Sequence, residues 1–152
     1  MRASITLLTA FLAAAVAQDY PFTEYICETT DGSPYLHHVN QLIDGLAGAA
    51  EGERLCNTGS GCGETITAYS GGGGAGLMLC GDSYRCGLSD NLPCAGNACG
   101  GIYARVASEA VAGLRDQCQG PDSNGDTRVG GKQVTHYSAD YESEIRVFSR
   151  PG

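Results

Sequence analysis

The stretch from Cys99 to Cys118 is CGGIYARVASEAVAGLRDQC, and it contains the clearest helical pattern in the chain. Apolar side chains at four-residue spacing fall on one face of an α-helix. Tyr103, Ala107 and Val111 widen that face, and Gly120-Pro121 ends it. We therefore predict an amphipathic helix over about 99–117, capped by Asn97, with its apolar stripe formed by Ile102, Val106, Ala110, Leu114 and Cys118.

An earlier segment carries a second helical pattern. Asp31-Gly32-Ser33-Pro34 is a typical helix start, with a capping side chain before a proline. Apolar residues then recur at three- and four-residue spacing and predict a helix over about 34–50. Its stripe comprises Leu36, Val39, Ile43, Leu46, Ala47 and Ala50.

The remaining apolar segments predict β-strands. Residues 64–69 and 77–80 indicate a hairpin whose turn is Gly71–Gly74, while 128–137 and 143–148 indicate two further strands. Residues 18–33 form an aromatic leader that Cys27 pins to the body. Two helices on one face of a sheet bury both stripes. The predicted fold is a disulfide-stabilised α+β two-layer sandwich, with two helices packed on an antiparallel sheet of about four strands.

The N-terminal residues predict export from the cell. Arg2 precedes an apolar run from Ile5 to Ala17, and Ala15-Val16-Ala17 supplies the small residues of a cleavage site. The run is short for a bilayer span, so we expect a signal peptide over 1–17 and no stable membrane anchor. The mature chain, 18–152, is then one secreted, extracellular domain.

Eight cysteines follow the predicted cleavage site, and an even count in an exported chain indicates a disulfide framework. A metal site is disfavoured because the chain has no C-x-x-C pair. We therefore expect neither a metal nor a cofactor, and predict that all eight are disulfide-bonded: Cys27, Cys56, Cys62, Cys80, Cys86, Cys94, Cys99 and Cys118.

Eight cysteines allow 105 pairings. The predicted helix would hold Cys99 and Cys118 too far apart for a direct bond, which excludes that pair. Disulfide pairings that close short loops, such as Cys56–Cys62, Cys80–Cys86 and Cys94–Cys99, remain possible.

The chain is acidic, with a formal charge of −8 that becomes −9 once Arg2 is removed. Its basic residues are scattered, whereas phosphate-binding surfaces need clustered lysine and arginine. Nucleic acid and anionic membranes are therefore disfavoured as partners.

Three patterns could carry chemistry. Asp122-x-Asn124-x-Asp126 resembles the opening of a calcium loop, but Thr127 and Gln133 stand where such a loop needs glycine and glutamate, so a hydrophilic turn is favoured. His136 could converge with Glu64 and Arg146 as in a ribonuclease, although a surface histidine is the simpler interpretation. No Gly-x-Ser-x-Gly elbow and no free thiol is expected, so we predict no catalytic residues and a protein that is not an enzyme.

The segment from Cys99 to Cys118, followed by Val129-Gly130-Gly131 and Ile145-Arg146-Val147, resembles the C-terminal half of fungal killer-toxin-like secreted proteins. This family includes virus-encoded killer toxins and necrosis-inducing effectors. The resemblance implies a cysteine-rich virulence protein that a fungus releases into the apoplast or medium. The acidic charge and the absence of a Lys/Arg pair depart from the basic or dibasic-processed toxins.

These observations predict a secreted effector or killer-toxin-like protein that binds an extracellular host or competitor protein or cell-surface component. The expected contact surface is the stapled loop Gly81–Gly101 together with the glycine turn. A ribonuclease-like secreted hydrolase and an inert cell-wall or extracellular structural protein are the alternatives.

Overall fold

The computed structural model describes residues 19–57, 62, 74–81, 84 and 101–150. Its helices are α1 (Leu36–Ala47) and α2 (Ala104–Cys118). The strands are β1 (Phe22–Cys27), β2 (Arg54–Leu55), β3 (Ala75–Cys80), β4 (Ile102–Tyr103), β5 (Gln119–Pro121), β6 (Thr127–Val129), β7 (Gly131–Ser138) and β8 (Tyr141–Ser149).

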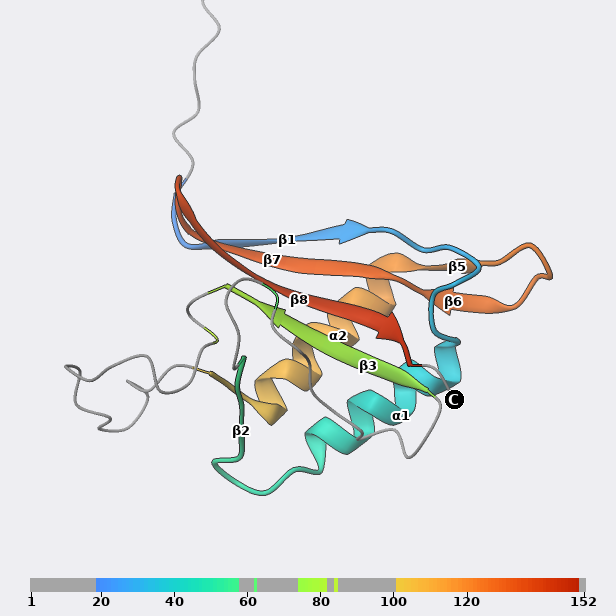
Figure 1. Ribbon diagram of the computed structural model, residues 1–152, viewed down its shortest axis with the longest axis horizontal. Coiled ribbons are helices and arrows are strands. Elements are labelled where there is room, and N and C mark those ends of the chain that lie inside the picture. The colour runs from blue at the N-terminus through green and yellow to red at the C-terminus, as the bar shows by residue number, and fades with distance from the viewer. Residues whose placement is uncertain (1–18, 58–61, 63–73, 82–83, 85–100, 151–152) are drawn as a thin grey trace, which may run out of the picture.

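The main sheet has four strands in the order β1-β7-β8-β3, with antiparallel pairing throughout. Both helices lie behind one face of this sheet (Figure 1). The predicted fold class is thus confirmed. Side chains from both layers form one core, whose fully buried members include Val39, Leu42, Leu46, Leu77, Val111, Leu114, Val129 and Ile145.

Cys27 pins the segment 18–33 to the body through its disulfide with Cys118, as predicted, but the interpretation of this segment as a leader was wrong, because Phe22–Cys27 forms edge strand β1. β1 pairs with β7 along its whole length, from Phe22 opposite His136 to Cys27 opposite Gly131. Its residues are mostly exposed, so the segment lacks the apolar alternation that would identify a strand. Backbone hydrogen bonds with β7 hold this segment in the sheet, although its own sequence does not indicate a strand.

Both helices are shorter than their patterns predicted. Helix α1 begins after Tyr35 and ends at Ala47, with Gly48 as its C-cap. Helix α2 begins after Tyr103, which is its N-cap, so the prediction of Asn97 as the cap was wrong. Ile102 and Tyr103 instead form the short strand β4, which pairs with β2. Because Ile102 and Tyr103 pair with β2, the helix begins only at Ala104 although the apolar pattern starts earlier.

The predicted strands are confirmed in part. Strand β8 contains the predicted segment 143–148, and β3, which contains the predicted segment 77–80, pairs with β8. The expected partner segment, 64–69, lies outside the described residues. The predicted strand 128–137 is divided at Gly130 into β6 and β7. Gly131 has a φ of 139°, and a Cβ there would collide with the Ile26 carbonyl oxygen. Only glycine permits this close approach of β1.

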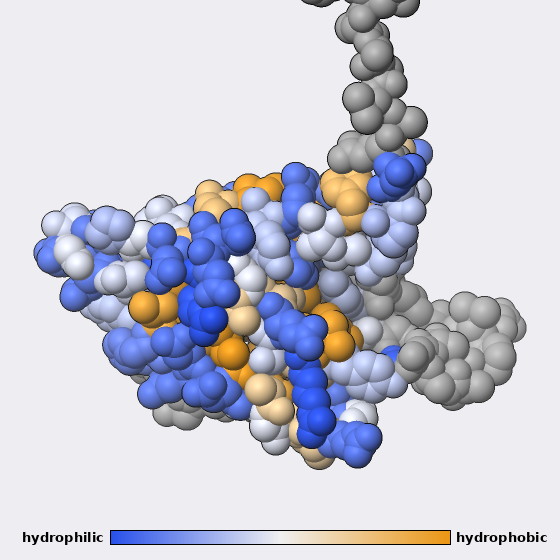
Figure 2. Space-filling model, turned by 180° about the vertical axis from the view of Figure 1, so that it is seen from behind, coloured by the Kyte–Doolittle hydropathy of each residue, from blue (hydrophilic) through white to orange (hydrophobic). Residues whose placement is uncertain are grey.

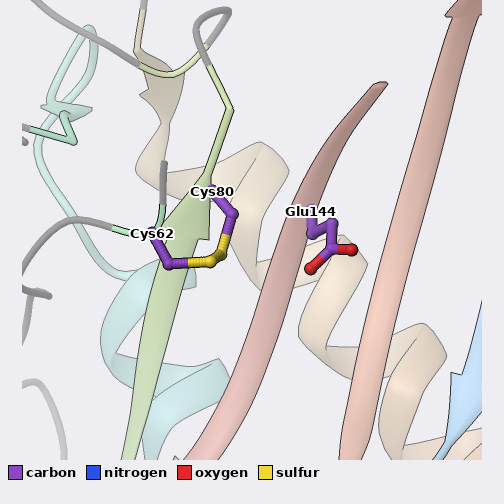
Figure 3. A group of neighbouring side chains, drawn as sticks. All are labelled: Cys62, Cys80 and Glu144. Atoms are coloured by element: carbon purple, nitrogen blue, oxygen red, sulfur yellow. A yellow bond between two sulfur atoms is a disulfide. The ribbon is translucent and has the colours of Figure 1, made fainter. Parts of the chain in front are cut away.

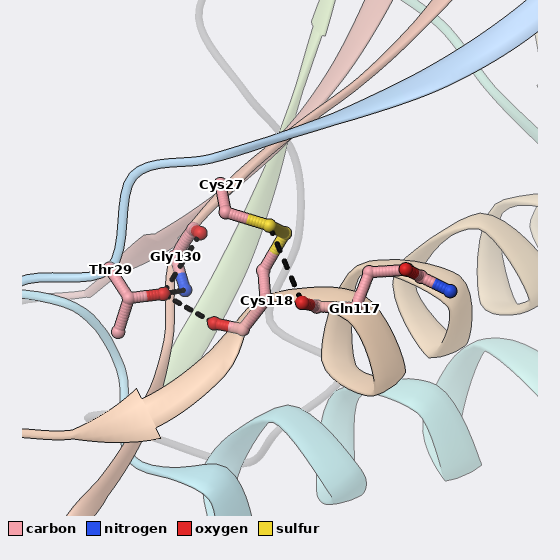
Figure 4. The surroundings of a disulfide bond; sticks show 5 residues. All are labelled: Cys27, Thr29, Gln117, Cys118 and Gly130. Atoms are coloured by element: carbon pink, nitrogen blue, oxygen red, sulfur yellow. Dashed lines mark hydrogen bonds between the residues drawn. A yellow bond between two sulfur atoms is a disulfide. The ribbon is translucent and has the colours of Figure 1, made fainter.

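A disulfide between Cys27 and Cys118 joins the end of β1 to the end of α2. Figure 4 shows the bond beside Thr29, whose hydroxyl contacts the Cys118 carbonyl. That hydroxyl also accepts a hydrogen bond from the Gly130 N–H at 3.1 Å. The junction therefore links β1, α2 and the start of β7.

A second disulfide joins Cys62 to Cys80 at the end of β3, which excludes the short loops Cys56–Cys62 and Cys80–Cys86. Cys56 is also disulfide-bonded. The bond from Cys118 to Cys27 confirms that Cys99 and Cys118 do not pair. Cys86, Cys94 and Cys99 lie outside the described residues.

Within the part of the chain that the structure describes, no helix has the length and apolar character needed to cross a membrane.

Replacing both Cys27 and Cys118 by alanine should lower the free energy of unfolding by about 2–5 kcal/mol, because the bond closes a loop across 91 positions. Urea unfolding followed by near-UV circular dichroism measures the change. An unfolding midpoint equal to that of the wild type would show that the noncovalent contacts of β1 suffice to hold α2.

Candidate binding groove

A groove of about 550 Å³ opens between the main sheet and the N-terminal half of α2. Four tyrosines line it, and we refer to it as the tyrosine groove. Its described lining residues are Thr23, Tyr25, Arg54, Tyr84, Gly101, Ile102, Tyr103, Val106, Glu109, Ala110, Gln133, Thr135 and Tyr137.

The path of α2 explains why the groove exists. Figure 1 shows α2 running obliquely behind the sheet, with its C-terminal end near β1 and β5 and its N-terminal end below β3. The Cys27–Cys118 bond fixes the C-terminal end. Gly113 allows close packing there, because a Cβ would overlap the Tyr25 ring. Toward Ala104 the helix diverges from β1 and β7, and a wedge opens between the two layers.

The sheet wall of the groove comes from alternate residues of two adjacent strands. β1 contributes Thr23 and Tyr25, and β7 contributes Gln133, Thr135 and Tyr137, because side chains two apart in a strand share a face. The Gln133 amide donates to the Tyr25 hydroxyl at 3.3 Å, and the hydroxyls of Thr23 and Thr135 are 3.5 Å apart. This wall therefore presents ordered hydroxyl and amide groups.

The helix wall contains an apolar residue that the fold does not cover. Val106 belongs to the predicted apolar stripe of the second helix, yet it is 47% exposed. Its stripe neighbours Ala110 and Leu114 are buried, as predicted. The expectation that the whole stripe is buried was wrong at Val106, because this side chain lines the groove while Ala104 and Ala107 face the core. Glu109 lies beside it on the same wall.

The end of the groove is formed by the β2–β4 pair and by Tyr84. The Arg54 guanidinium lies 4.5 Å from the centre of the Tyr103 ring, which is a cation–π contact. Tyr84 is buried, and its hydroxyl forms hydrogen bonds with Thr135 and Tyr137. Burial, followed by the neighbouring Tyr137, raises the pKa of the Tyr84 hydroxyl. This hydroxyl therefore stays protonated within its hydrogen bonds to Thr135 and Tyr137.

The groove also meets the surface expected from the sequence. Of the loop Gly81–Gly101, the structure describes Gly81, Tyr84 and Gly101, and the last two line the groove. The predicted glycine turn lies outside the described residues except for Gly74. Figure 2 shows the helix side of the molecule, where apolar residues form small patches between hydrophilic ones.

His136 lies on the opposite face of the sheet, between two carboxylates. Its Nε2 is 2.7 Å from Glu24, its Nδ1 is 3.2 Å from Glu142, and its ring stacks on Phe22. Arg146 pairs instead with Glu144, and the register places it opposite Lys132, four positions from His136 along β7. His136 and Arg146 therefore do not converge, and Glu64 lies outside the described residues.

A second charged cluster occupies the same face. The Glu144 carboxylate accepts hydrogen bonds from Lys132 Nζ at 2.7 Å and from Arg146 Nε at 2.6 Å. Glu144 stands opposite Cys80 in the register, so Cys62, Cys80 and Glu144 bring possible metal-ligand atoms within 4.8 Å (Figure 3). The two sulfurs are bonded to each other and offer no thiolate, which is the form that ligates metals.

The segment that resembled a calcium loop is the turn between β5 and β6, as the sequence favoured. One Asp122 carboxylate oxygen accepts hydrogen bonds from the Asn124 and Asp126 N–H groups. The other accepts from Arg128 at 2.8 Å. These bonds use the Asp122 side chain to stabilise the turn.

Comparison with protein-family models, with curated proteins and with solved structures found no match to this chain. The fold and its disulfides thus define it as a small disulfide-bonded α+β protein. The resemblance to killer-toxin-like proteins stays a prediction.

Reasoning from sequence did not find the tyrosine groove. The alternation of Gln133, Thr135 and Tyr137 was available as a signal that these side chains share a face. This alternation did not indicate that the three side chains line an open groove.

The charged cluster predicts an acid dependence of stability. Burial of Glu144 opposes ionisation, but the hydrogen bonds from Lys132 and Arg146 outweigh burial and lower the pKa of Glu144 from 4.5. A lowered folded-state pKa stabilises the protein above pH 4.5, and this stabilisation is lost as the pH falls through the folded-state value.

The variant Glu144→Gln should therefore be less stable at neutral pH and lose less stability than the wild type below pH 4.5. Denaturant unfolding over a pH series measures both effects. Glu51→Gln, at an exposed position after α1, is the matched control. Parallel pH curves for the wild type and Glu144→Gln would contradict the assignment.

Proposed function

We propose that this protein is a small secreted, cysteine-rich binding protein that acts outside the cell on a host or competitor, as an effector or killer-toxin-like protein. The tyrosine groove is its contact surface. The target is an extracellular protein or a cell-surface component.

The observation that carries this proposal is the exposed apolar and aromatic wall of the groove. Val106 stays 47% exposed although it continues a buried helical stripe, and Tyr25 and Tyr137 are 37% and 38% exposed. Tyrosines combine a rigid apolar ring with a polar end and are enriched at binding surfaces. A concave site with such rings and a few polar groups is the usual form of a ligand site.

The disulfides support the extracellular part of the proposal. Such bonds persist in oxidising environments and are rare in the cytosol. The Cys27–Cys118 and Cys62–Cys80 bonds each attach a strand of the main sheet to another part of the chain. They favour a protein that stays folded among extracellular proteases.

Cell-surface binding tests the proposal. Fluorescently labelled, disulfide-intact protein should bind saturably to plant protoplasts or to yeast cells. The variant Val106→Asp should bind at least about tenfold more weakly, because it places a charge on the apolar wall of the groove. Flow cytometry over a concentration series measures both.

Ile26→Asp is the matched control, because Ile26 is 36% exposed on the opposite face of β1. It should bind like the wild type. An absence of saturable binding to either cell type, or equal binding by Val106→Asp, would contradict the proposal. The first result would favour an inert structural protein.

A secreted hydrolase is the second candidate, and the carboxylates on both sides of His136 favour it. Such a histidine could act as a general acid or base. If so, purified protein should cleave RNA or a polysaccharide, and His136→Ala should lose that activity by at least about a hundredfold. His37→Ala, at an exposed position of α1, is the control. Inactive wild-type protein, or an active His136→Ala variant, would remove this candidate.

A further inference from the structure

We infer that the tyrosine groove binds a short, uncharged oligosaccharide, an inference that rests on the proposed function and names the ligand of the same site. Its volume of about 550 Å³ lies within the roughly 300–1,000 Å³ of small-ligand sites. The chemistry of its walls, described next, distinguishes a sugar from other ligands of this size.

The tyrosine rings supply the apolar part of sugar recognition. A pyranose ring has C–H faces that pack flat against an aromatic ring. Tyr25 and Tyr137 are partly exposed on the sheet wall, and Tyr103 of β4 also lines the groove. Arg54 covers part of the Tyr103 ring and orients it. The groove thus offers rings on more than one wall, which suits a chain of sugars better than a single ring.

The polar lining matches the hydroxyl groups of a sugar. Each sugar hydroxyl both donates and accepts, so it needs partners of both kinds. Gln133 provides an amide with both functions, Glu109 provides an acceptor, and Arg54 provides donors. The Tyr84 hydroxyl is hydrogen-bonded to Thr135 and Tyr137 and holds these two side chains at the groove lining. The lining therefore supplies both donors and acceptors.

Other ligand classes fit less well. Among the described lining residues, Arg54 is the only cation and Glu109 the only anion, so the groove lacks the charge excess that a phosphate or carboxylate ligand needs. A lipid needs a continuous apolar wall, whereas threonine, glutamine and glutamate interrupt this one.

Isothermal titration calorimetry with defined sugars tests the inference. The disulfide-intact protein is titrated with hexasaccharides of β-1,3-glucose, β-1,4-glucose, β-1,4-N-acetylglucosamine, β-1,4-xylose and α-1,6-mannose. At least one should bind saturably. Tyr103→Ala should weaken that binding about tenfold through loss of stacking, while Tyr103→Phe should retain most of it.

Two further variants keep the test decisive if Tyr103→Ala does not fold. Gln133→Ala should weaken sugar binding by removing a hydrogen-bonding amide, and Tyr137→Ala by removing a second ring. Tyr20→Ala is the matched control, because Tyr20 is 43% exposed and lies outside the groove lining. It should bind sugar like the wild type. Near-UV circular dichroism shows which variants are folded.

Two outcomes overturn the inference: no hexasaccharide binds, or the folded groove variants bind sugar as well as Tyr20→Ala does. These outcomes are separable from failure of the proposed function. Groove-dependent binding to cells that none of the hexasaccharides inhibits would keep the function and point to a protein ligand. Cell binding that Val106→Asp does not affect would remove both.

Discussion

The covalent bond between Cys27 and Cys118 sets the relative position of the two layers. It ties the C-terminal end of α2 to an edge strand whose own residues are mostly exposed. Apolar burial alone gives such a strand little reason to stay in the sheet, so the bond and the β7 hydrogen bonds hold it there. The Thr29 hydroxyl also forms hydrogen bonds with the N–H and the carbonyl of Gly130. These bonds attach the segment that follows β1 to the same junction.

The groove is a geometric result of this attachment. One end of α2 is held close to β1, where Gly113 admits the Tyr25 ring, and the helix axis is oblique to the strands. The other end must therefore separate from β1 and β7. The short β2–β4 pair and Tyr84 close the resulting wedge at one end, and its walls combine exposed rings with hydrogen-bonding groups.

The two faces of the main sheet differ in the interactions that stabilise them. The helix face buries Leu77, Leu79 and Ile145 in the apolar core. The opposite face carries charged side chains in two clusters, one around His136 and one around Glu144. The long side chains of the second cluster cover β-sheet surface while their charged ends pair, which explains how Glu144 is buried and ionised at once.

Local patterns in the sequence determined the two helices, three of the four strands of the main sheet and the disulfide-rich α+β class, because apolar periodicity and an even cysteine count report burial and oxidation directly. The tertiary structure decided which cysteines pair, that Phe22–Cys27 becomes an edge strand, and that β3 joins β8. It also decided that Val106 stays exposed beside four tyrosines. These features depend on distances between residues far apart in the chain, and such distances leave no periodic signal in either partner.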